Sequence, residues 1–212
     1  LVMEQTAEWG GRARIDDQIF NSQAVSTFVE ETVTYLRSLS NVNLRTRMMG
    51  AGVYDHGYLI GYERLTDHDP KALGPRHRLW RIRAGHIITA TGAIERPLAF
   101  AENDKPGVVL ASALRDYLVD YGISLGRKTV VVTNNDDAYL TAIAIKNADM
   151  EVPAIIDSRQ GGAGELGALA RSMGIRIETG KGISKVHGGK SVTGVAICLQ
   201  SGKGRVLENI EC

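Results

Sequence analysis

Cysteine is scarce in this chain of 212 residues. Only Cys198 and Cys212 occur, and they are too far apart to form a Cys-x-x-Cys pair. Two cysteines supply neither a framework of disulfides nor the four ligands of a structural zinc site. A redox disulfide of the thioredoxin-reductase type needs the closely spaced pair that is missing here. The sequence therefore predicts none of these three kinds of site.

Long hydrophobic runs and an excess of charge are also missing. No apolar stretch approaches the roughly 20 residues that a membrane-spanning helix needs, and the first residues lack the basic region of a secretory signal. Basic and acidic residues number 25 and 24, so the net charge is only +1. Such a balance gives no electrostatic reason to expect nucleic acid or a membrane as a partner. We expect a protein of the reducing cytoplasm.

No group of residues has the spacing of a catalytic centre. The five histidines are isolated from one another in the sequence, and no Ser-His-acid arrangement or metal-ligand spacing is visible. Each histidine is more easily explained as a solvated or hydrogen-bonded side chain. We therefore predict no catalytic residue and no metal site in this chain.

The first part of the chain predicts a strand, a helix and a β-meander. Leu1–Glu4 has the pattern of a strand that ends in an acid, and Ser22 or Ser26 is placed to cap a helix that runs to Leu39 with one apolar face. Further β-rich segments follow, and the break Asp55–Gly57 has the glycine of a tight hairpin. The expected strands are 41–47, 48–54, 57–65, 78–83 and a buried one at 87–89.

The second part alternates between strand and helix. The expected order is strand 129–133, helix 136–147, strand 152–157, helix 165–173 and strand 175–179, with another strand at 192–199. This order is typical of a parallel sheet with crossover helices. The glycines of segment 122–128 mark the seam. We expect two domains, residues 1–124 and 125–212.

The apolar, β-branched segment 87–89 leads into Ala90-Thr91-Gly92, where glycine lets the backbone turn or pass close to a ligand. This arrangement resembles the second flavin-side signature of the two-dinucleotide-domain flavoprotein reductases. The longer run ATGAIERPLAFAENDKPGVVLASALRDYLVDY, from Ala90 to Tyr121, resembles the α subunit of heterotetrameric sarcosine oxidase and related amine dehydrogenases. The length of that run makes the resemblance specific.

The resemblance implies an α/β fold class: an incomplete FAD/NAD(P)-binding Rossmann-like fold with a β-meander, plus a second Rossmann-like parallel-sheet unit. It implies an oxidoreductase acting on CH-NH groups, part of a complex that oxidises an N-methyl amino acid. The oxidation itself is expected on another subunit, so the partners are the other sarcosine oxidase subunits. NAD or FAD is the cofactor expected in the intact subunit. Because no Gly-rich turn precedes Leu1, we expect the chain to be an excised piece of a longer polypeptide. We expect this piece to be inactive alone, and whether it binds a cofactor stays open.

The resemblance also assigns cofactor-binding residues in the first domain. Glu4 corresponds to the acid that accepts hydrogen bonds from the adenosine ribose, although a solvated carboxylate is the alternative. Gly10 and Gly11 would allow close backbone approach, and Arg12 would reach a phosphate or carboxylate, while an ordinary surface turn explains them equally well. Thr91 and Gly92 would lie beside the cofactor, unless they form only a packed turn.

The second domain has a poor phosphate-binding turn. In Thr133–Ala138, Asn135 is the candidate cofactor-binding residue. It takes the place of the second glycine of Gly-x-Gly-x-x-Gly/Ala, where a side chain obstructs the pyrophosphate. Asp136 and Asp137 suit a helix N-terminus but repel a phosphate. Sarcosine oxidase α subunits likewise show a Thr-Asn-Asn-Asp turn here. We therefore interpret Asp157, at the ribose-acid position, as unexploited, and the glycines of 162–167 as a flexible loop.

Two other functions remain open. A fragment of an NAD(P)H-dependent flavin reductase shares the Ala-Thr-Gly segment, but requires an intact nicotinamide fingerprint at Thr133–Ala138. A non-catalytic scaffold that holds partner subunits is consistent with the lack of catalytic residues.

Overall fold

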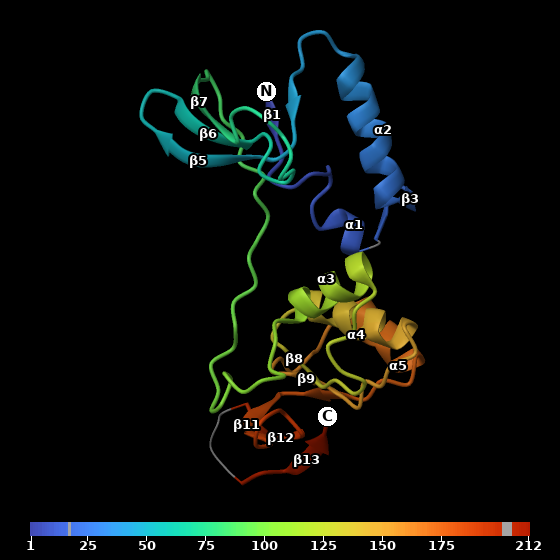
Figure 1. Cartoon of the computed structure of the whole chain (residues 1–212). Coiled ribbons are helices and arrows are strands. Elements are labelled where there is room, and N and C mark those ends of the chain that lie inside the picture. The colour runs from blue at the N-terminus through green and yellow to red at the C-terminus, as the bar shows by residue number, and fades with distance from the viewer. Residues whose placement is uncertain (17, 201–204) are drawn as a thin grey trace. The chain divides into compact units, whose positions relative to one another are not determined.

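The computed structural model describes residues 1–16, 18–200 and 205–212 (Figure 1). Contacts between Cα atoms divide the chain into two compact units, Leu1–Gly92 and Ala93–Cys212. Among the described residues, no helix is both long and hydrophobic enough to cross a membrane.

The first unit contains a β-α-β crossover. Strand β1 (Val2–Met3) pairs in parallel with β4 (Leu44–Arg45). Between them lie α1 (Ala13–Asp16), a short hairpin of β2 (Ile19–Phe20) and β3 (Gln23–Ala24), and α2 (Val25–Ser38). Parallel strands need such a crossover, because a tight turn cannot connect them.

Helix α2 has the apolar face that the sequence predicts, with Val29 and Val33 half-buried. Its start differs from the prediction. The residue before the helix is Ala24, which makes no side-chain cap, and Ser26 already lies inside the first turn. The hairpin that precedes α2 brings the chain into the helix directly, so neither serine is at the capping position.

The β-meander is confirmed. Strands β5 (Met48–Tyr54), β6 (Tyr58–Arg64) and β7 (His77–Arg83) form an antiparallel sheet in the order β5-β6-β7. The expected hairpin lies between the first two strands, and both His56 and Gly57 have positive φ angles there. Met48 of β5 and Leu59 of β6 are the buried hydrophobic residues of this sheet.

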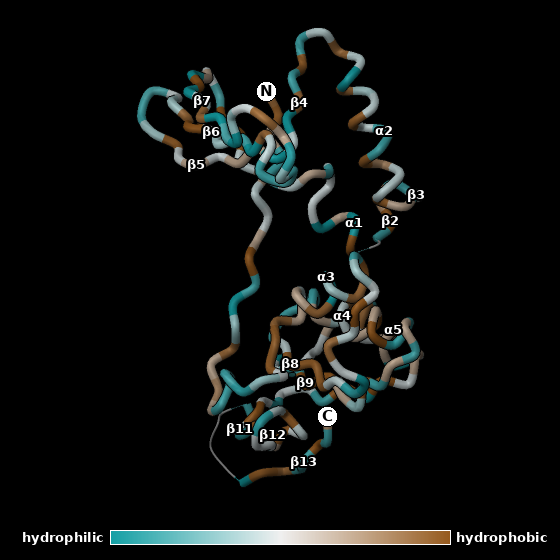
Figure 2. The backbone as a smooth tube through the Cα atoms, viewed as in Figure 1, coloured by the Kyte–Doolittle hydropathy of each residue, from teal (hydrophilic) through white to brown (hydrophobic). Residues whose placement is uncertain are grey.

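The prediction of a buried strand at 87–89 is wrong. Residues 86–100 form no strand or helix, and Ile88 is 92% exposed. Ile94, further along the same segment, is 93% exposed, and Figure 2 shows hydrophobic residues within this extended segment. A β-branched run becomes a buried strand only where neighbouring strands pair with it, and none does so among the described residues.

The second unit has the predicted alternation. After α3 (Ala111–Tyr121) come, in chain order, β8 (Val131–Thr133), α4 (Asp137–Asn147), β9 (Ile155–Asp157), α5 (Gly164–Ser172) and β10 (Ile177–Thr179). The three strands form a parallel sheet in the order β10-β9-β8. The Rossmann-like, parallel-sheet fold is therefore confirmed.

A second, antiparallel sheet follows in the same unit. It consists of β11 (Lys181–His187), β12 (Gly194–Leu199) and β13 (Glu208–Glu211), in that order. The predicted strand at 192–199 corresponds to β12, and its two partners were not expected from the sequence.

Two hydrophobic cores cover the two faces of the parallel sheet. Ile155 packs with the residues of α3, α4 and α5, whereas its neighbour Ile156 packs with those of the antiparallel sheet. Successive side chains of a strand point to opposite faces, so a strand between two layers is apolar at every position. Burial of each isoleucine contributes roughly 1.5–3 kcal/mol.

The segment 93–124 packs with the second unit through α3, which contacts α4. The compact units thus divide at Gly92, while the domain boundary expected from the sequence lies between residues 124 and 125.

Candidate functional site

Glu4 lies where the sequence places it, at the carboxyl end of β1. Its backbone continues the parallel ladder, since the N–H of Glu4 donates to the carbonyl of Arg45 at 2.8 Å. Oε1 of its carboxylate accepts hydrogen bonds from the backbone N–H of Thr6 at 2.7 Å and from the Thr6 hydroxyl at 3.0 Å. Thr6 therefore fixes the orientation of the carboxylate and binds only one of its two oxygens.

The Gly10–Gly11 turn begins six residues later along the chain. Gly10 has φ +107°, and a Cβ there would lie 3.1 Å from a methyl carbon of Val29 on α2. Gly11 has φ +48°, and a Cβ there would meet no atom within 4 Å. Packing against α2 thus accounts for Gly10, whereas the space around Gly11 is open to a ligand.

Arg12 already has an anionic partner. Its Nη2 lies 3.2 Å from Oδ1 of Asp16, four residues on. A phosphate or carboxylate bound by Arg12 would have to compete with this ion pair. A cavity of about 520 Å³ between segment 7–14 and α2 is lined by Arg14 and not by Arg12. Sequence reasoning did not find that cavity.

Thr91 and Gly92 are exposed and lie outside any helix or strand. Gly92 has φ +67°, with no atom within 4 Å of a Cβ placed there. Among the described residues, no packing contact accounts for this glycine. Glu4, Gly11 and Arg12 follow β1 within one stretch of the chain, whereas Thr91 and Gly92 are exposed residues of the segment 86–100.

In the second unit, the turn between β8 and α4 is satisfied by its own side chains. The Thr133 hydroxyl accepts a hydrogen bond from the backbone N–H of Asn135 at 3.0 Å, and Oδ1 of Asn135 accepts one from the N–H of Asp137 at 3.1 Å. A pyrophosphate binds to such a helix through free N–H groups at its start. Asn135 therefore occupies, with its own oxygen, a donor that the phosphate would use.

The acid that begins α4 is also paired. Arg115, a buried residue of α3, donates from Nη1 to the carbonyl of Asp137 at 2.9 Å and from Nη2 to its Oδ1 at 2.8 Å. No pattern in the sequence indicates this contact, because the two residues are 22 positions apart and belong to different helices. The pair ties α3 to the start of α4.

Asp157, at the ribose-acid position, is fully buried and fully used. It accepts hydrogen bonds from the Tyr139 hydroxyl at 2.8 Å, from the backbone N–H of Arg159 at 2.9 Å, and from Nε and Nη2 of Arg159 at 3.1 and 2.8 Å. The same guanidinium contacts Asp136 at 2.7 Å. Each oxygen of the carboxylate thus accepts two hydrogen bonds from residues of this chain.

Electrostatics follow from these contacts. Burial disfavours the ionised form of Asp157, but the hydrogen bonds from Arg159 and Tyr139 outweigh it and hold the pKa of the carboxyl below its usual value. Burial, together with the hydrogen bond to Asp157, raises the pKa of Tyr139 to about 12. Asp157 is thus a stable anion and Tyr139 a stable phenol, as expected of a structural network.

Of the glycines of 162–167, Gly162 packs closely against its neighbours, whereas a Cβ on Gly164 would meet no atom within 4 Å. A Cβ on Gly162 would lie 3.4 Å from the hydroxyl of Tyr139, and α5 already begins at Gly164. The prediction of a flexible loop over the whole segment 162–167 is therefore wrong beyond Ala163, where the chain is helical. Among the residues that the structure describes, no three or more His, Cys, Asp or Glu side chains are grouped to hold a metal ion.

No protein-family model matches the chain. It is 37% identical over 202 residues to sarcosine oxidase subunit alpha of Rhizobium meliloti (strain 1021), which covers 91% of the chain and 20% of that protein. It is 37% identical over 185 residues to the subunit of the same name from Corynebacterium sp. (strain P-1), covering 85% of the chain and 19% of that protein. The chain spans about one fifth of the length of the curated relatives it matches.

Solved structures share the fold. Thioredoxin reductase of T. acidophilum aligns over 99% of the chain and 64% of its own, with a TM-score of 0.65 and 14% identity. L-proline dehydrogenase of P. horikoshii aligns over 99% of the chain and 34% of its own, with a TM-score of 0.58 and 20% identity. The resemblance and the fold class expected from the sequence are both confirmed.

Proposed function

We propose that this chain, whose sequence matches about one fifth of the sarcosine oxidase α subunits, contributes part of a dinucleotide site to an oxidoreductase that oxidises an N-methyl amino acid. Glu4 accepts hydrogen bonds from the adenosine ribose of NAD or FAD, and Gly11 gives the cofactor room beside the backbone. Arg12, Thr91 and Gly92 complete the contacts from this chain.

The geometry of Glu4 carries the proposal. A carboxylate at the carboxyl end of a parallel strand is the ribose acceptor of dinucleotide-binding folds. Here Thr6 binds Oε1 by two hydrogen bonds, and neither of these uses Oε2. The side chain is held in place and still has an oxygen with which to accept a ribose hydroxyl.

The second unit supports a structural role. The N–H of Asp137 is bonded to Asn135, and Asp157 is bonded to Tyr139 and Arg159. An NAD(P)H-dependent flavin reductase would need both groups free for its nicotinamide cofactor. This observation favours the amine-oxidising complex over the reductase fragment, and it is compatible with a unit that holds partner subunits.

The chemistry is assigned to another subunit of the complex. The sequence shows no Ser-His-acid arrangement, and its five histidines are isolated from one another along the chain. Its residues bind and orient a cofactor, and the remaining sarcosine oxidase subunits are its partners.

Isothermal titration calorimetry of the 212-residue chain with NAD, NADP and FAD tests the proposal. We expect weak binding, with a dissociation constant on the order of 1 mM, and no binding detectable after Glu4→Gln, because a hydrogen bond to a charged group contributes about 1.5–3 kcal/mol. Glu31→Gln, an exposed acid of α2, is the matched control and should bind like the native chain.

Equal binding by the native chain and Glu4→Gln would remove Glu4 from the site. Reduction of an artificial dye by NADH in the presence of the isolated chain would favour the reductase instead.

A further inference from the structure

One face of the β-meander gathers tyrosine and arginine side chains. Along β6, every second residue is buried and the residues between them are half-buried. Successive side chains of a strand point to opposite faces, so this alternation separates a buried face from an outer one. The registers of β5, β6 and β7 place six large polar side chains on the outer face, which we call the tyrosine–arginine face: Tyr54, Tyr58, Tyr62, Arg64, Arg81 and Arg83.

Tyr58 is the centre of this face. Its hydroxyl accepts a hydrogen bond from Nε of Arg81 at 3.1 Å, and the guanidinium carbon of Arg83 lies 5.7 Å from the centre of its ring. The ring of Tyr54 lies 6.0 Å away on the neighbouring strand and covers Gly52, where an added Cβ would lie 2.7 Å from the tyrosine hydroxyl. These contacts orient the side chains in advance, which lowers the entropy that binding a partner would cost.

The arginines of the face have neutral partners. Nη2 of Arg64 donates to a backbone carbonyl at 2.8 Å, and Nη1 of Arg83 donates to another at 2.9 Å, as Arg81 does to the tyrosine hydroxyl. Among the described residues none of the three forms an ion pair, whereas the arginines on the opposite face pair with Glu63. The face therefore has positive charges without carboxylates to balance them. A guanidinium group binds a carboxylate through paired N–H donors.

The other positions of the face indicate a protein partner. They hold Met49, Ile60 and Leu79, with a glycine and a histidine. Tyr, Met and Arg are enriched in the cores of protein interfaces, and Lys, Glu, Asp, Ser and Ala are depleted there. The registers place none of these five depleted types on the face. The composition is therefore that of a surface which binds a polypeptide.

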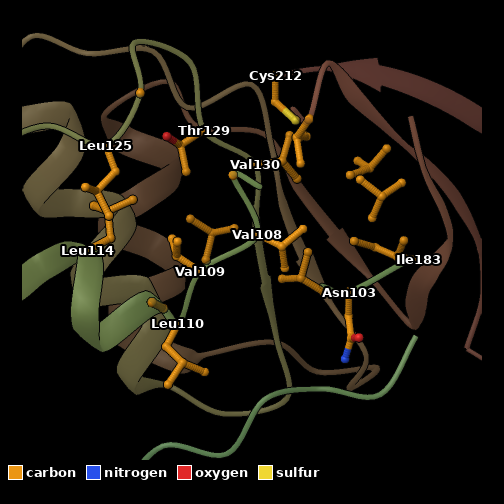
Figure 3. A pocket seen from close by; sticks show the side chains of 18 of the residues that line it. Asn103, Val108, Val109, Leu110, Leu114, Leu125, Thr129, Val130, Ile183 and Cys212 are labelled. Atoms are coloured by element: carbon orange, nitrogen blue, oxygen red, sulfur yellow. The ribbon is translucent and has the colours of Figure 1, made fainter. Parts of the chain in front are cut away.

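An apolar cavity in the second unit has a different chemistry. Its volume is about 720 Å³, and the side chains that Figure 3 labels are mainly those of valine, leucine and isoleucine. Such a lining does little to distinguish one apolar ligand from another. The arginines of the tyrosine–arginine face, in contrast, select for negative charge.

Two other occupants fit this face poorly. A two-fold contact with a second copy would bring identical patches together and place arginines against arginines, which is repulsive. A nucleic acid would meet carboxylates at both ends of the sheet, since Asp55 lies in the hairpin at one end and Asp67 and Asp69 lie in the loop at the other. These acids repel phosphates.

We propose that the tyrosine–arginine face docks an acidic segment of another polypeptide, in which Asp or Glu residues alternate with apolar ones. In the proposed function this polypeptide is another subunit of the oxidoreductase, and the inference rests on that function in this respect alone. The contact does not involve the dinucleotide site.

Fluorescence anisotropy with two synthetic peptides tests the chemistry, without NAD or FAD. One peptide alternates Glu with Leu or Val, and its control has Lys in place of every Glu. The face has fewer residues than the roughly 20–30 that each side of a complete interface supplies. We therefore expect the acidic peptide to bind with a dissociation constant on the order of 10–100 μM and the lysine peptide not to bind.

Two matched pairs of variants locate the contact. Arg81→Glu should weaken binding of the acidic peptide about tenfold, whereas Arg127→Glu, at an exposed arginine of the second unit, should change it less than about twofold. Leu79→Ser should weaken binding about fivefold, and Leu73→Ser, in the loop between β6 and β7, should have no effect. Leu79 is 63% and Leu73 96% exposed, and both arginines are exposed, so all four variants are expected to fold.

Photo-cross-linking identifies the partner. A photoreactive amino acid replaces Tyr54, which is 55% exposed, in the complete α subunit co-expressed with the other subunits. Mass spectrometry of the purified complex then locates the cross-link. We expect it in an acidic segment of a different subunit.

Four results would overturn the inference. The two peptides bind alike, or neither binds. Arg81→Glu and Arg127→Glu bind the acidic peptide alike. A single-stranded oligonucleotide binds the face more tightly than the acidic peptide. The cross-link is absent, or it joins the face to the same subunit, to a second copy or to a segment without acids. Failure of NAD binding, with the peptide results as expected, would count against the dinucleotide site alone.

Discussion

Replacing Asp157 by Asn separates a structural carboxylate from a ribose-binding one. Asp157 is fully buried and holds Tyr139 and Arg159 by four hydrogen bonds. Loss of one partner of a buried ion pair costs about 3–5 kcal/mol. Arg159 is about one third exposed and keeps Asp136, so part of that cost is avoided. We expect Asp157→Asn to lower the free energy of unfolding by roughly 2–4 kcal/mol.

The effect has a defined pH dependence. Because the folded pKa of Asp157 lies below its unfolded value, its contribution to stability is fully present above the unfolded pKa of about 4. It is lost as the pH falls through the lower, folded pKa. The difference between the native chain and Asp157→Asn should therefore be constant from neutral pH down to about 5 and shrink below about 4.

Urea unfolding followed by circular dichroism measures this difference. With a typical slope of about 1–3 kcal/mol per molar urea, the midpoint should fall by roughly 1–2 M. Asp120→Asn, an exposed acid of α3, is the matched control and should shift it little. Stability within about 0.5 kcal/mol of the native chain, combined with weaker NAD binding, would refute a structural role.

Three further predictions follow from single contacts. Gly10→Ala should lower the free energy of unfolding by about 1–3 kcal/mol, because its Cβ meets Val29 at 3.1 Å and φ is +107°; Gly11→Ala, which meets nothing within 4 Å, should cost less in the same urea titration. Glu95→Gln should lower the melting temperature, since its carboxylate accepts the first backbone N–H groups of α3 at 3.2 and 2.7 Å, a cap that contributes about 1 kcal/mol. In a spectrophotometric titration Tyr139 should ionise near pH 12, and this ionisation should be absent in Tyr139→Phe. The contribution of Tyr139 to stability should be complete below about pH 10 and should be lost as the pH rises to 12.

The second unit could be predicted from the sequence because β8 and β9 each begin with two consecutive apolar, β-branched residues and because helices alternate with the strands. Ile155 and Ile156 face different cores, and that requirement is visible in the residue types alone. The position of Glu4 after a parallel strand was equally visible, as an acid that ends an apolar run.

The failures have a common cause, which is dependence on distant partners. Residues 87–89 have the composition of a buried strand, but a strand requires neighbours that the described chain does not supply. Arg115 and Glu95 act through contacts with helix starts 22 and 16 residues away, and periodicity carries no information about such pairs. Tertiary contacts decided each of these cases.

The most direct test of the central claim is an NMR titration of the isotope-labelled chain with NAD, read residue by residue. The account predicts chemical-shift changes centred on Glu4 and Gly11, with the amides of Asn135 and Asp157 unchanged. Changes centred on Asn135 and Asp157, with Glu4 unaffected, would contradict it.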